Sequence, residues 1–397
     1  MTSNRPHSQE RDAKMTNATL KVLGFMTGTS LDGIDMAVID TDGEARLDFG
    51  PWAEKPVPAA VRALLEDTVK AALKWPRGDD EPAIFTQARA ALVEWHAESA
   101  QAFLKANGLT YGDLDAMGVH GQTVLHERPK AGVPGRTVQL FDGQALADLT
   151  GADVVCDFRQ ADIQAGGEAA PLAPVYHRAL AQKAGLELPV VVVNLGGVAN
   201  ITLIDADLSL TALDTGPANG LMDQWMRLHG RGDYDHEGQI AASGKVSADI
   251  LKHYMSHAYF EAGAPKSLDR YDFTLEGVQG LSVEDGMATL SAFTVGSLMA
   301  GIALVGARPK TVILAGGGRQ NTFLVSQIRQ RLAPARVIAA EELGWRGGAI
   351  EAEAFAYMAA RSLKGLPISF PGTTGVKAPL TGGNLFKPRP AAQSLAS

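Results

Sequence analysis

The sequence predicts an α/β protein built from two similar units, and two observations lead to this fold class. The chain has 397 residues, which exceeds the size of most single hydrophobic cores. Three runs of β-favouring residues, separated by glycine and aspartate turns, begin at Lys21 and again at Leu188, and helical patterns follow each set. The repeat lies in the pattern and not in residue identity, and it predicts a duplicated α/β unit.

The first half is predicted to open with a meander of three strands over residues 21–50. Two helices follow, and Gly108 is a natural stop signal for the second one. The remaining expected elements are a strand at 114–123, a strand at 136–141, a helix at 143–151 and a strand at 152–158.

The second half is predicted to begin again with strands over 188–216 and a helix at 219–230. A long apolar helix at 282–306 and a strand, glycine turn and amphipathic helix over 309–332 come next. The glycine- and proline-rich residues 366–397 indicate a tail or a lid loop. We therefore expect a flexible extension (1–20), an N-terminal α/β domain (21–185), a C-terminal α/β domain (186–365) and a C-terminal segment (366–397).

Composition favours a soluble cytoplasmic protein. Residues are 46% hydrophobic and 20% charged, and we found no apolar run of the roughly 18 residues that a membrane span needs. The polar first twenty residues lack a signal-peptide core, and Met15 is an alternative start. The single cysteine, Cys156, fits a reducing compartment. A net charge of −8 argues against a nucleic-acid surface.

Three glycine-rich turns are candidate ligand surfaces, and the first reads GFMTGTSLDGID from residue 24. It lacks the lysine of a Walker loop, and a strand follows it where a Rossmann fingerprint needs a helix. What remains is a hairpin whose backbone N–H groups and hydroxyls (Thr27, Thr29, Ser30) suit an anion. Asp32 and Asp35 either position a cation through water or are ordinary turn residues.

The other two turns lie in the second half. Asp214 ends a strand before a glycine turn, where it would contact a metal–phosphate group or cap the next helix. The glycines at 316–318 would let a ligand lie against bare backbone between a strand and a helix, which Asn321 or Thr322 would cap.

Together these turns resemble the superfamily of sugar kinases, actin and heat-shock chaperone ATPases. Within it the sequence is similar to the anhydro-N-acetylmuramic acid kinase family over residues 21–385. The similarity rests on GFMTGTSLDGID, GVHGQTVLH, DFRQADIQAGGEAAPLAP, VVVNLGGVANIT, LDTGPANGLMD, LAGGGRQN, IEAEAFAYMA and PGTTGVKAPLTGG, in the family's order. The resemblance implies two duplicated RNase H-like domains of the actin-like ATPase fold, with ATP in the cleft between them. It places the phosphate loop and the sugar site in the N-terminal domain (21–185) and ATP binding in the C-terminal domain (186–365).

The resemblance also implies an activity. Such enzymes use ATP and Mg2+ in peptidoglycan recycling, open the 1,6-anhydro ring of anhydro-N-acetylmuramic acid with water, and phosphorylate O6. It further implies a cytoplasmic homodimer that acts on a small amino sugar, with no nucleic acid or membrane as a partner. Phosphoryl transfer needs mainly positioning and charge neutralisation, which backbone amides and Mg2+ supply.

The resemblance assigns site residues by motif position. Asp162 matches the proposed base for water, although the residues alone would make it an ordinary loop acid. Arg159 either pairs with Asp157 or binds anionic ligand groups. The turn of His120, Gly121, Gln122 and Thr123 ends a strand and contacts the sugar, as does Glu351, which we favour over Glu353. The expected ATP contacts are Gly28, Thr29, Ser30, Leu31, Asp32, Gly33, Ile34, Asp35, Asp214, Thr215, Gly216, Gly316, Gly317, Gly318 and Asn321, with Asp32 and Asp214 as candidate Mg2+ ligands.

The chain departs from the family pattern where GGQGAPL is usual. Glu168 adds a charge, and Ala169 replaces a more flexible glycine, so the sugar geometry there is open. Thr27 replaces the more frequent serine of MSGTS and keeps the hydroxyl.

Two other functions compete with this prediction. An ordinary sugar kinase, or a phosphatase of phosphate polymers on the same scaffold, would act on a free sugar hydroxyl or on polyphosphate. A non-enzymatic sugar-sensing switch would need a basic helix-turn-helix, and a chaperone-like switch a peptide-binding module.

Overall fold

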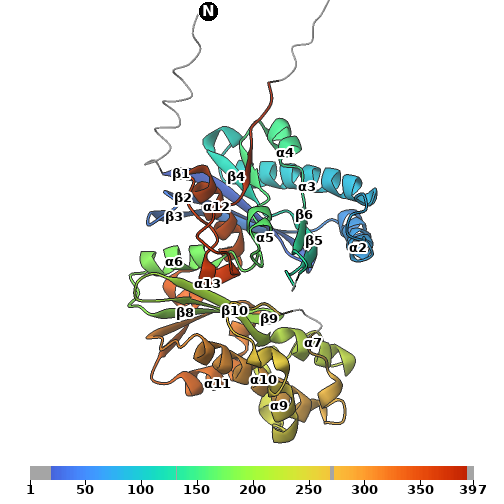
Figure 1. Cartoon of the computed structure of the whole chain (residues 1–397), viewed down its shortest axis with the longest axis vertical. Helices are drawn as coiled ribbons and strands as arrows, with labels where there is room; N and C mark the ends of the chain where they lie inside the picture. The colour runs from blue at the N-terminus through green and yellow to red at the C-terminus, as the bar shows by residue number, and fades with distance from the viewer. Residues whose placement is uncertain (1–18, 131, 269–271, 391–397) are drawn as a thin grey trace, which may run out of the picture. The chain divides into compact units, whose positions relative to one another are not determined.

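The structure is a computed structural model, and it describes residues 19–130, 132–268 and 272–390. The chain forms two compact units (Figure 1). The first comprises Met1–Ala179, Gly348–Phe370 and Val376–Ser397, and the second comprises Leu180–Gly347 and Pro371–Gly375. The predicted extension 1–20, with the alternative start Met15, lies almost wholly outside the described residues.

The first unit is built on a six-stranded sheet with the order β13-β7-β4-β1-β2-β3. The meander expected over 21–50 is confirmed, and each of its strands is antiparallel to the next. β4 and β7 then add in parallel, and β13 closes the edge in the antiparallel direction. The strands are β1 (Leu20–Thr27), β2 (Gly33–Thr41), β3 (Leu47–Pro56), β4 (Ala116–Val119), β7 (Val154–Cys156) and β13 (Asn384–Phe386).

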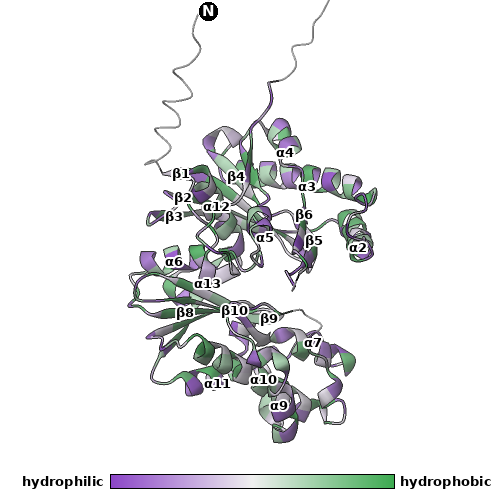
Figure 2. Cartoon of the chain, in the orientation of Figure 1, coloured by the Kyte–Doolittle hydropathy of each residue, from purple (hydrophilic) through white to green (hydrophobic). Residues whose placement is uncertain are grey.

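Amphipathic helices cover this sheet because each carries an apolar stripe at helical spacing. α3 alternates hydrophobic and hydrophilic residues along its length (Figure 2) and buries Phe85, Leu92 and Phe103. It ends at Ala106, and Gly108 follows with a φ of +68°, as the stop signal predicted. The helices are α2 (Ala59–Leu73), α3 (Ile84–Ala106), α4 (Gly143–Thr150), α5 (Gln160–Gln164), α6 (Pro174–Lys183, which runs across the unit boundary) and α12 (Ile350–Leu363), with a 3₁₀ turn at Tyr111–Asp113.

The single strand expected at 114–123 is wrong, because two strands form there. β4 stops at Val119, and β5 (Gln122–Glu127) begins a separate two-stranded ladder with β6 (Arg136–Leu140). Gly121 lies between them with a φ of +77°, which ends the extended backbone. His120 and Gly121 therefore form the connection, whereas Gln122 and Thr123 start β5.

The second unit repeats the strand arrangement of the first. Its sheet has the order β10-β9-β8-β11-β12, with β8, β9 and β10 as an antiparallel meander and β11 and β12 added in parallel. The strands are β8 (Val190–Leu195), β9 (Val198–Ile204), β10 (Leu210–Pro217), β11 (Thr311–Ala315) and β12 (Arg336–Ala339). The helices are α7 (Asn219–Leu228), α8 (Gln239–Ser243), α9 (Ala248–Met255), α10 (Val283–Leu304), α11 (Thr322–Leu332) and α13 (Pro371–Thr374), with 3₁₀ turns at His236–Gly238, Ala258–Glu261, Glu276–Val278, Gly317–Gln320 and Ala340–Leu343.

In both sheets, strands numbered by their order in the chain of each unit thus lie side by side as third, second, first, fourth and fifth, and they have the same relative directions. The predicted fold class, two duplicated RNase H-like α/β domains, is confirmed at the level of strand order. Hydrophobic strands and helix faces fill a separate core in each unit.

The long apolar helix expected at 282–306 is confirmed as α10, and its composition needs one correction. With 22 residues and a mean hydropathy of 1.7 in its most apolar window, it is long and apolar enough to cross a membrane, contrary to our sequence-based expectation. However, 67% of that window is buried inside the protein, and Phe293 and Leu298 belong to the core of the second unit. The helix is packed as a core helix.

Within the described residues 366–390, the C-terminal segment is neither a tail nor a lid loop, contrary to the prediction. β13 pairs with β7, the 371–374 helix lies against β10, and the side chains of Ile368 and Val376 are buried. Glycine and proline here mark turns between packed pieces. Residues 391–397 fall outside the described part of the chain.

The unit boundaries also differ from the predicted domains. α12 lies within the predicted C-terminal domain 186–365, yet it packs on β1, β2 and β4 of the first unit. Two glycines that face each other across β1 and β4 permit this packing, Gly24 and Gly118. A Cβ atom at Gly24 would overlap the carbonyl oxygen of Ala352, and one at Gly118 would overlap that of Phe355. The helix therefore lies directly on strand backbone.

We predict that Gly24→Ala destabilises the protein by about 1–3 kcal/mol, because the added methyl group forces α12 away from β1. Urea unfolding measures this free energy. Gly112→Ala is the control, since the nearest atom to its Cβ would be 3.7 Å away. Equal stabilities of the two variants would contradict the close approach.

Candidate functional site

The loop that opens with Gly28 is a tight hairpin between β1 and β2, as predicted. Leu31 has a positive φ of 55°, and its N–H donates to the carbonyl oxygen of Gly28 at 3.3 Å. The carboxylate of Asp32 accepts from the Ser30 hydroxyl at 2.7 Å and from the N–H of Gly33 at 2.9 Å. Thr29 and Ser30 are exposed at the tip. Asp32 thus stabilises the turn, and a phosphate contact by this hairpin stays a prediction.

The hairpin is joined to the predicted sugar turn by two hydrogen bonds. The buried Thr27 hydroxyl donates to the Gly121 carbonyl at 3.0 Å, and the Gln122 amide donates to the Gly28 carbonyl at 3.1 Å. Two motifs that are 94 residues apart in the sequence therefore lie together in the first unit.

Arg159 connects this turn to the predicted base. Its Nε donates to Nε2 of His120 at 3.1 Å, and its Nη1 donates to the Ala169 carbonyl at 2.6 Å. The N–H of Ala169 in turn donates to Oδ1 of Asp162 at 2.7 Å. The structure thus brings together three predicted site residues: His120, Arg159 and Asp162.

Arg159 does not pair with Asp157 as one alternative held, since Asp157 accepts from the Asn384 amide at 3.3 Å. Burial lowers the pKa of Arg159 to about 10, although the carboxylates of Glu351 and Asp162 oppose this shift.

His120 is a neutral side chain in this environment. Burial, followed by the nearby Arg159 charge, holds the pKa of His120 well below its ordinary value. Because Nε2 accepts from Arg159, the ring proton is assigned to Nδ1. Nδ1 is buried and has no hydrogen-bond partner among the described residues. The ring orients Arg159 without adding a second positive charge.

The loop after α5 wraps around the Asp162 carboxyl group, which is 1% exposed. Gly167 lies so close that a Cβ atom there would overlap Oδ1 of Asp162. Ala169, which replaces the glycine usual in the family, keeps a left-handed φ of 59°. Its N–H and carbonyl groups both bond charged side chains, Asp162 and Arg159. These bonds offset the strain that a residue with a Cβ atom meets at positive φ.

The two glutamates of α12 differ in their environments. Glu353 is fully buried and accepts from the Tyr176 hydroxyl at 2.6 Å. Glu351 reaches solvent in the first turn of the helix, yet desolvation is the largest cause of its raised pKa. The Arg159 charge opposes this shift, and the Asp32 charge adds to it. The charges of Arg159 and Asp32 thus both act on Glu351, and its contact with the sugar stays a prediction.

In the second unit, the predicted Asp-Thr-Gly turn is wrong, because these residues lie inside β10. A bulge between Asp214 and Gly216 interrupts the register with β9. The Thr215 hydroxyl donates to the Ala199 carbonyl, and a Cβ atom at Gly216 would overlap Ser297 of α10. Asp214 also does not cap α7, which starts at Asn219 after Ala218.

A segment that our sequence analysis missed holds Asp214 in place. The N–H of Asp214 donates to the Lys266 carbonyl at 2.9 Å, and its Oδ2 accepts from the N–H of Leu268 at 2.7 Å. The Tyr259 hydroxyl donates to the Asp214 carbonyl, and the Lys266 ammonium lies 4.3 Å from the centre of the Tyr259 ring. The sequence APKSL carries no periodic or motif signal for this role.

Three glycine segments meet in the second unit. The Gly196 and Gly197 carbonyls accept from the N–H groups of Asn219 and Ala218, at 2.9 and 3.0 Å. A Cβ atom at Gly318 would press on Leu195 and Asn219. The side chain of Asn321 accepts from the N–H of Leu324 at 2.9 Å and caps α11, so one of the two expected caps is confirmed. Contacts of Gly316–Gly318 and Asn321 with ATP stay predictions.

No group of three or more His, Cys, Asp or Glu side chains within residues 19–130, 132–268 and 272–390 could hold a metal ion. A metal here would take most of its ligands from elsewhere, as Mg2+ does when it binds substrate phosphates and water.

The duplicated sheets and the glycine connections at their corresponding ends define a class of protein, the α/β proteins built from two RNase H-like units. Residues 20–388 match the family described as AnmK, anhydro-N-acetylmuramic acid kinase, and the chain belongs to this family.

Curated relatives agree with this assignment. The chain is 52% identical to the anhydro-N-acetylmuramic acid kinase of Phenylobacterium zucineum over 93% of this chain and 100% of the relative. It is 53% identical to that of Caulobacter vibrioides over 92% and 98% of the two chains. Among solved structures, the chain is similar to component A of (R)-2-hydroxyglutaryl-CoA dehydratase from Acidaminococcus fermentans. The match covers 86% of this chain and 99% of the dehydratase component, at 14% identity and a TM-score of 0.45, and it supports no conclusion.

Asp35 is a second carboxyl group in an acidic setting. It lies half-buried on β2 opposite Glu54 of β3, and burial, followed by the charges of Glu54, Glu351 and Asp32, raises its pKa to about 7. The folded protein thus binds this proton more tightly than the unfolded chain does. Ionisation of Asp35 therefore lowers the free energy of unfolding. This loss is absent below the ordinary pKa of 3.8, grows as the pH rises, and is complete above about pH 7.

We therefore predict that Asp35→Asn stabilises the protein by about 1–2 kcal/mol at about pH 8, allowing for partial exposure, and that the gain vanishes near pH 4. Unfolding curves across this range measure the difference. The exposed Asp79→Asn serves as the control and is expected to change little at any pH. A gain that does not depend on pH would refute the shifted pKa.

Proposed function

We propose that this protein catalyses ATP-dependent ring opening and phosphorylation of anhydro-N-acetylmuramic acid in peptidoglycan recycling. The substrate has no free 6-hydroxyl group, because O6 is bonded to C1. Water attacks C1, the bond from C1 to O6 breaks, and O6 takes the γ-phosphoryl group while ADP leaves. The products are N-acetylmuramic acid 6-phosphate and ADP, and one proton of the water passes to a base.

The observation that carries this proposal is the setting of Asp162 within a chain that belongs to the kinase family. Its carboxyl group is buried, and one oxygen is fixed by the N–H of Ala169, which Arg159 holds through the Ala169 carbonyl. A general base needs a carboxylate held in one orientation within reach of the water. Among the residues assigned by motif, Asp162 is the one with this support.

Sugar contacts are proposed for the side chains around this base. His120 lies in the connection after β4, Gln122 and Thr123 begin β5, and this region is bonded to the β1–β2 hairpin. The charge of Arg159 acts on Glu351. A carboxylate at Glu351 would accept hydrogen bonds from sugar hydroxyl groups.

ATP binding is proposed for the glycine segments of each unit. In the second unit, Gly316 to Gly318 follow β11 and precede the capped helix α11, an arrangement that offers backbone N–H groups to phosphates. In the first unit, the 28–35 hairpin offers exposed hydroxyls and N–H groups.

Mg2+ is proposed as the metal, with Asp214 and Asp32 as candidate ligands. Carboxylate oxygens are the donors that Mg2+ prefers, and few protein ligands are needed when phosphates and water supply the rest. The Asp214 backbone and one carboxylate oxygen are held by the 259–268 segment, which would orient the carboxyl group. When bound, the ion neutralises the phosphate charges during transfer.

A cytoplasmic homodimer is part of the proposal and rests on the family resemblance, together with a single, buried cysteine for the compartment. Light scattering of the purified protein tests the dimer. The mass of one chain would remove that part of the proposal.

We predict that Asp162→Asn lowers turnover by at least about 100-fold while ATP and sugar affinities change little, because the amide cannot accept the proton. Steady-state kinetics and calorimetric titration measure both. Asp157→Asn makes the same change five positions earlier, where the side chain bonds Asn384, and is expected to keep most of the activity. Near-normal turnover by Asp162→Asn would rule out this residue as the base.

The test of the whole reaction uses 18O-labelled water with ATP and the anhydro-sugar. Mass spectrometry is expected to find one label on the C1 hydroxyl of a 6-phosphate and none in the phosphate. An ordinary sugar kinase would instead phosphorylate a free sugar and leave the anhydro-sugar unchanged. A phosphatase would release labelled phosphate from polyphosphate, and a sensor would bind sugar without any product.

A further inference from the structure

One ion pair, Arg319 with Glu341, holds the glycine turn at 316–318 in the second unit. Nε and Nη2 of Arg319 lie 2.8 and 2.6 Å from Oε1 of Glu341, and Nη1 donates to the Gly316 carbonyl at 2.8 Å. The backbone N–H of Arg319 donates to the same carbonyl at 3.3 Å. Arg319 therefore holds the Gly316 carbonyl with two donors and is itself held by a carboxylate.

The sheet of the second unit brings this pair together. Gly316 follows β11 directly, and Glu341 lies in the 3₁₀ turn that follows β12. Because β11 and β12 are parallel neighbours, their carboxyl ends lie at the same edge of the sheet. Gly347 packs against the pair, since a Cβ atom there would overlap Nη2 of Arg319 and Oε1 of Glu341. The Arg319 side chain is consequently only 17% exposed.

The hold on the Gly316 carbonyl sets the direction of the next N–H group. A trans peptide is planar, and its C=O and N–H bonds point in opposite directions. The bond between Gly316 and Gly317 is trans, since the cis bonds of the described residues all precede proline. With its carbonyl directed to Arg319, this peptide turns the Gly317 N–H away from Arg319.

Two N–H groups of the turn, those of Gly317 and Gly318, have no hydrogen-bond partner among the described residues. Gly317 is exposed, whereas Gly318 is buried. A buried N–H group without a partner costs free energy unless a ligand or water meets it. Both groups are donors, and neighbouring N–H groups of a glycine turn suit the oxygens of a phosphate.

The fold itself does not require a glycine at position 317. Its φ is not left-handed, and a Cβ atom there would meet only the Asn219 side chain, at the ordinary distance of 3.7 Å. At Gly316, by contrast, a Cβ atom would overlap the carbonyl group of Leu195. The missing side chain at Gly317 instead leaves the backbone open to the close approach of a ligand.

We propose that Arg319, held by Glu341, is a positioning residue that fixes the Gly316 peptide so that the next two N–H groups of the turn bind a nucleotide phosphate. This inference rests on the proposed function, which places ATP at these glycines, and adds the side chain that controls the affinity there. Arg319 acts through the peptide and not by contact with the nucleotide.

Calorimetric titration of the full-length protein with ADP, in the presence of Mg2+, tests this role. We expect Arg319→Ala to raise the Kd of ADP by about 10-fold, as for the loss of one hydrogen bond to a charged group. Glu341→Gln is expected to cause a smaller rise, because a neutral amide holds the guanidinium less tightly than a carboxylate does. Thermal unfolding shows whether each variant folds. Unchanged ADP affinity in the folded variants would overturn the inference.

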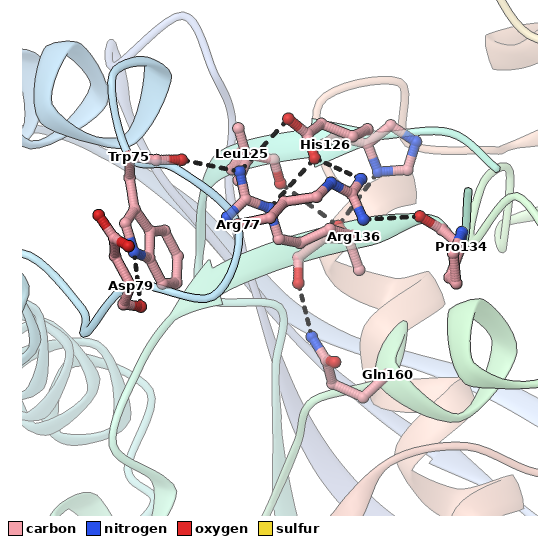
Figure 3. A network of polar contacts seen from close by, with 10 residues as sticks. Trp75, Arg77, Asp79, Leu125, His126, Pro134, Arg136 and Gln160 are labelled. Carbon is pink, nitrogen blue, oxygen red and sulfur yellow. Dashed lines mark hydrogen bonds and ion pairs between the residues drawn. The ribbon is translucent and has the colours of Figure 1, made fainter. Parts of the chain in front are cut away.

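Arg136→Ala is the matched control. Arg136 also bonds one glutamate, Glu127, and one backbone carbonyl, that of Trp75, and its side chain is 18% exposed (Figure 3). It lies on β6 in the first unit. Its removal takes away the same kinds of bond outside the glycine turn, so the Kd of ADP is expected to stay within about twofold of the wild type. Equal losses of affinity in Arg136→Ala and Arg319→Ala would overturn the inference.

A double variant tests the route through the Gly317 N–H. Gly317→Ala is expected to weaken ADP binding by about 10-fold in a folded protein, because the methyl group hinders the approach of the phosphate. Combined with Arg319→Ala, the two losses are expected to be less than additive, because both act on the same N–H group. Full additivity would overturn the inference. Gly280→Ala controls for the change in chain flexibility, since a Cβ atom there would meet nothing within 4 Å.

Failure of the proposed function has a different result. A wild-type protein that binds no ADP would refute the nucleotide site and this inference with it. ADP binding by the wild type that is indifferent to Arg319 would refute the inference alone.

Discussion

The candidate site depends on one guanidinium group, that of Arg159. It bonds the imidazole of His120 through Nε and the carbonyl of Ala169 through Nη1. A planar guanidinium has donors in fixed directions, so it sets the relative positions of the segments that it joins. The N–H of Ala169 then fixes Asp162. A single cation thus links the start of α5 and the loop that follows α5 to the turn after β4, which lies 39 residues earlier in the sequence.

Sequence alone predicted the fold well where periodicity and turn chemistry agree. The two meanders, the stop at Gly108 and the cap at Asn321 are local features, and each is confirmed. The expectations that failed depended on packing partners far along the chain. Asp214, Thr215 and Gly216 look like a turn, but the 259–268 segment and α10 hold them in a bulged edge strand. β13 could not be expected, because its three residues form a strand only when β7 is beside them.

The site residues divide in the same way. Asp162 has no local signal in the sequence, and only motif position identified it, whereas its burial and its bond to Ala169 are three-dimensional facts. Lys266 acts on Asp214 through its backbone carbonyl, for which almost any residue suffices, whereas Tyr259 acts through its side-chain hydroxyl. Such residues become visible only when hydrogen-bond partners are known.

Ala169 departs from the family pattern and still bonds both Asp162 and Arg159. Ala169 has a φ of 59°, which a glycine would adopt without strain. The alanine also has a Cβ atom, which must fit in a fully buried position. The conformation persists because its N–H and carbonyl groups both bond ionised side chains, and such bonds are stronger than those between neutral groups. The same two bonds restrict Asp162 and Arg159. The strained backbone of Ala169 and the fixed orientation of the Asp162 carboxyl group are therefore maintained by the same hydrogen bonds.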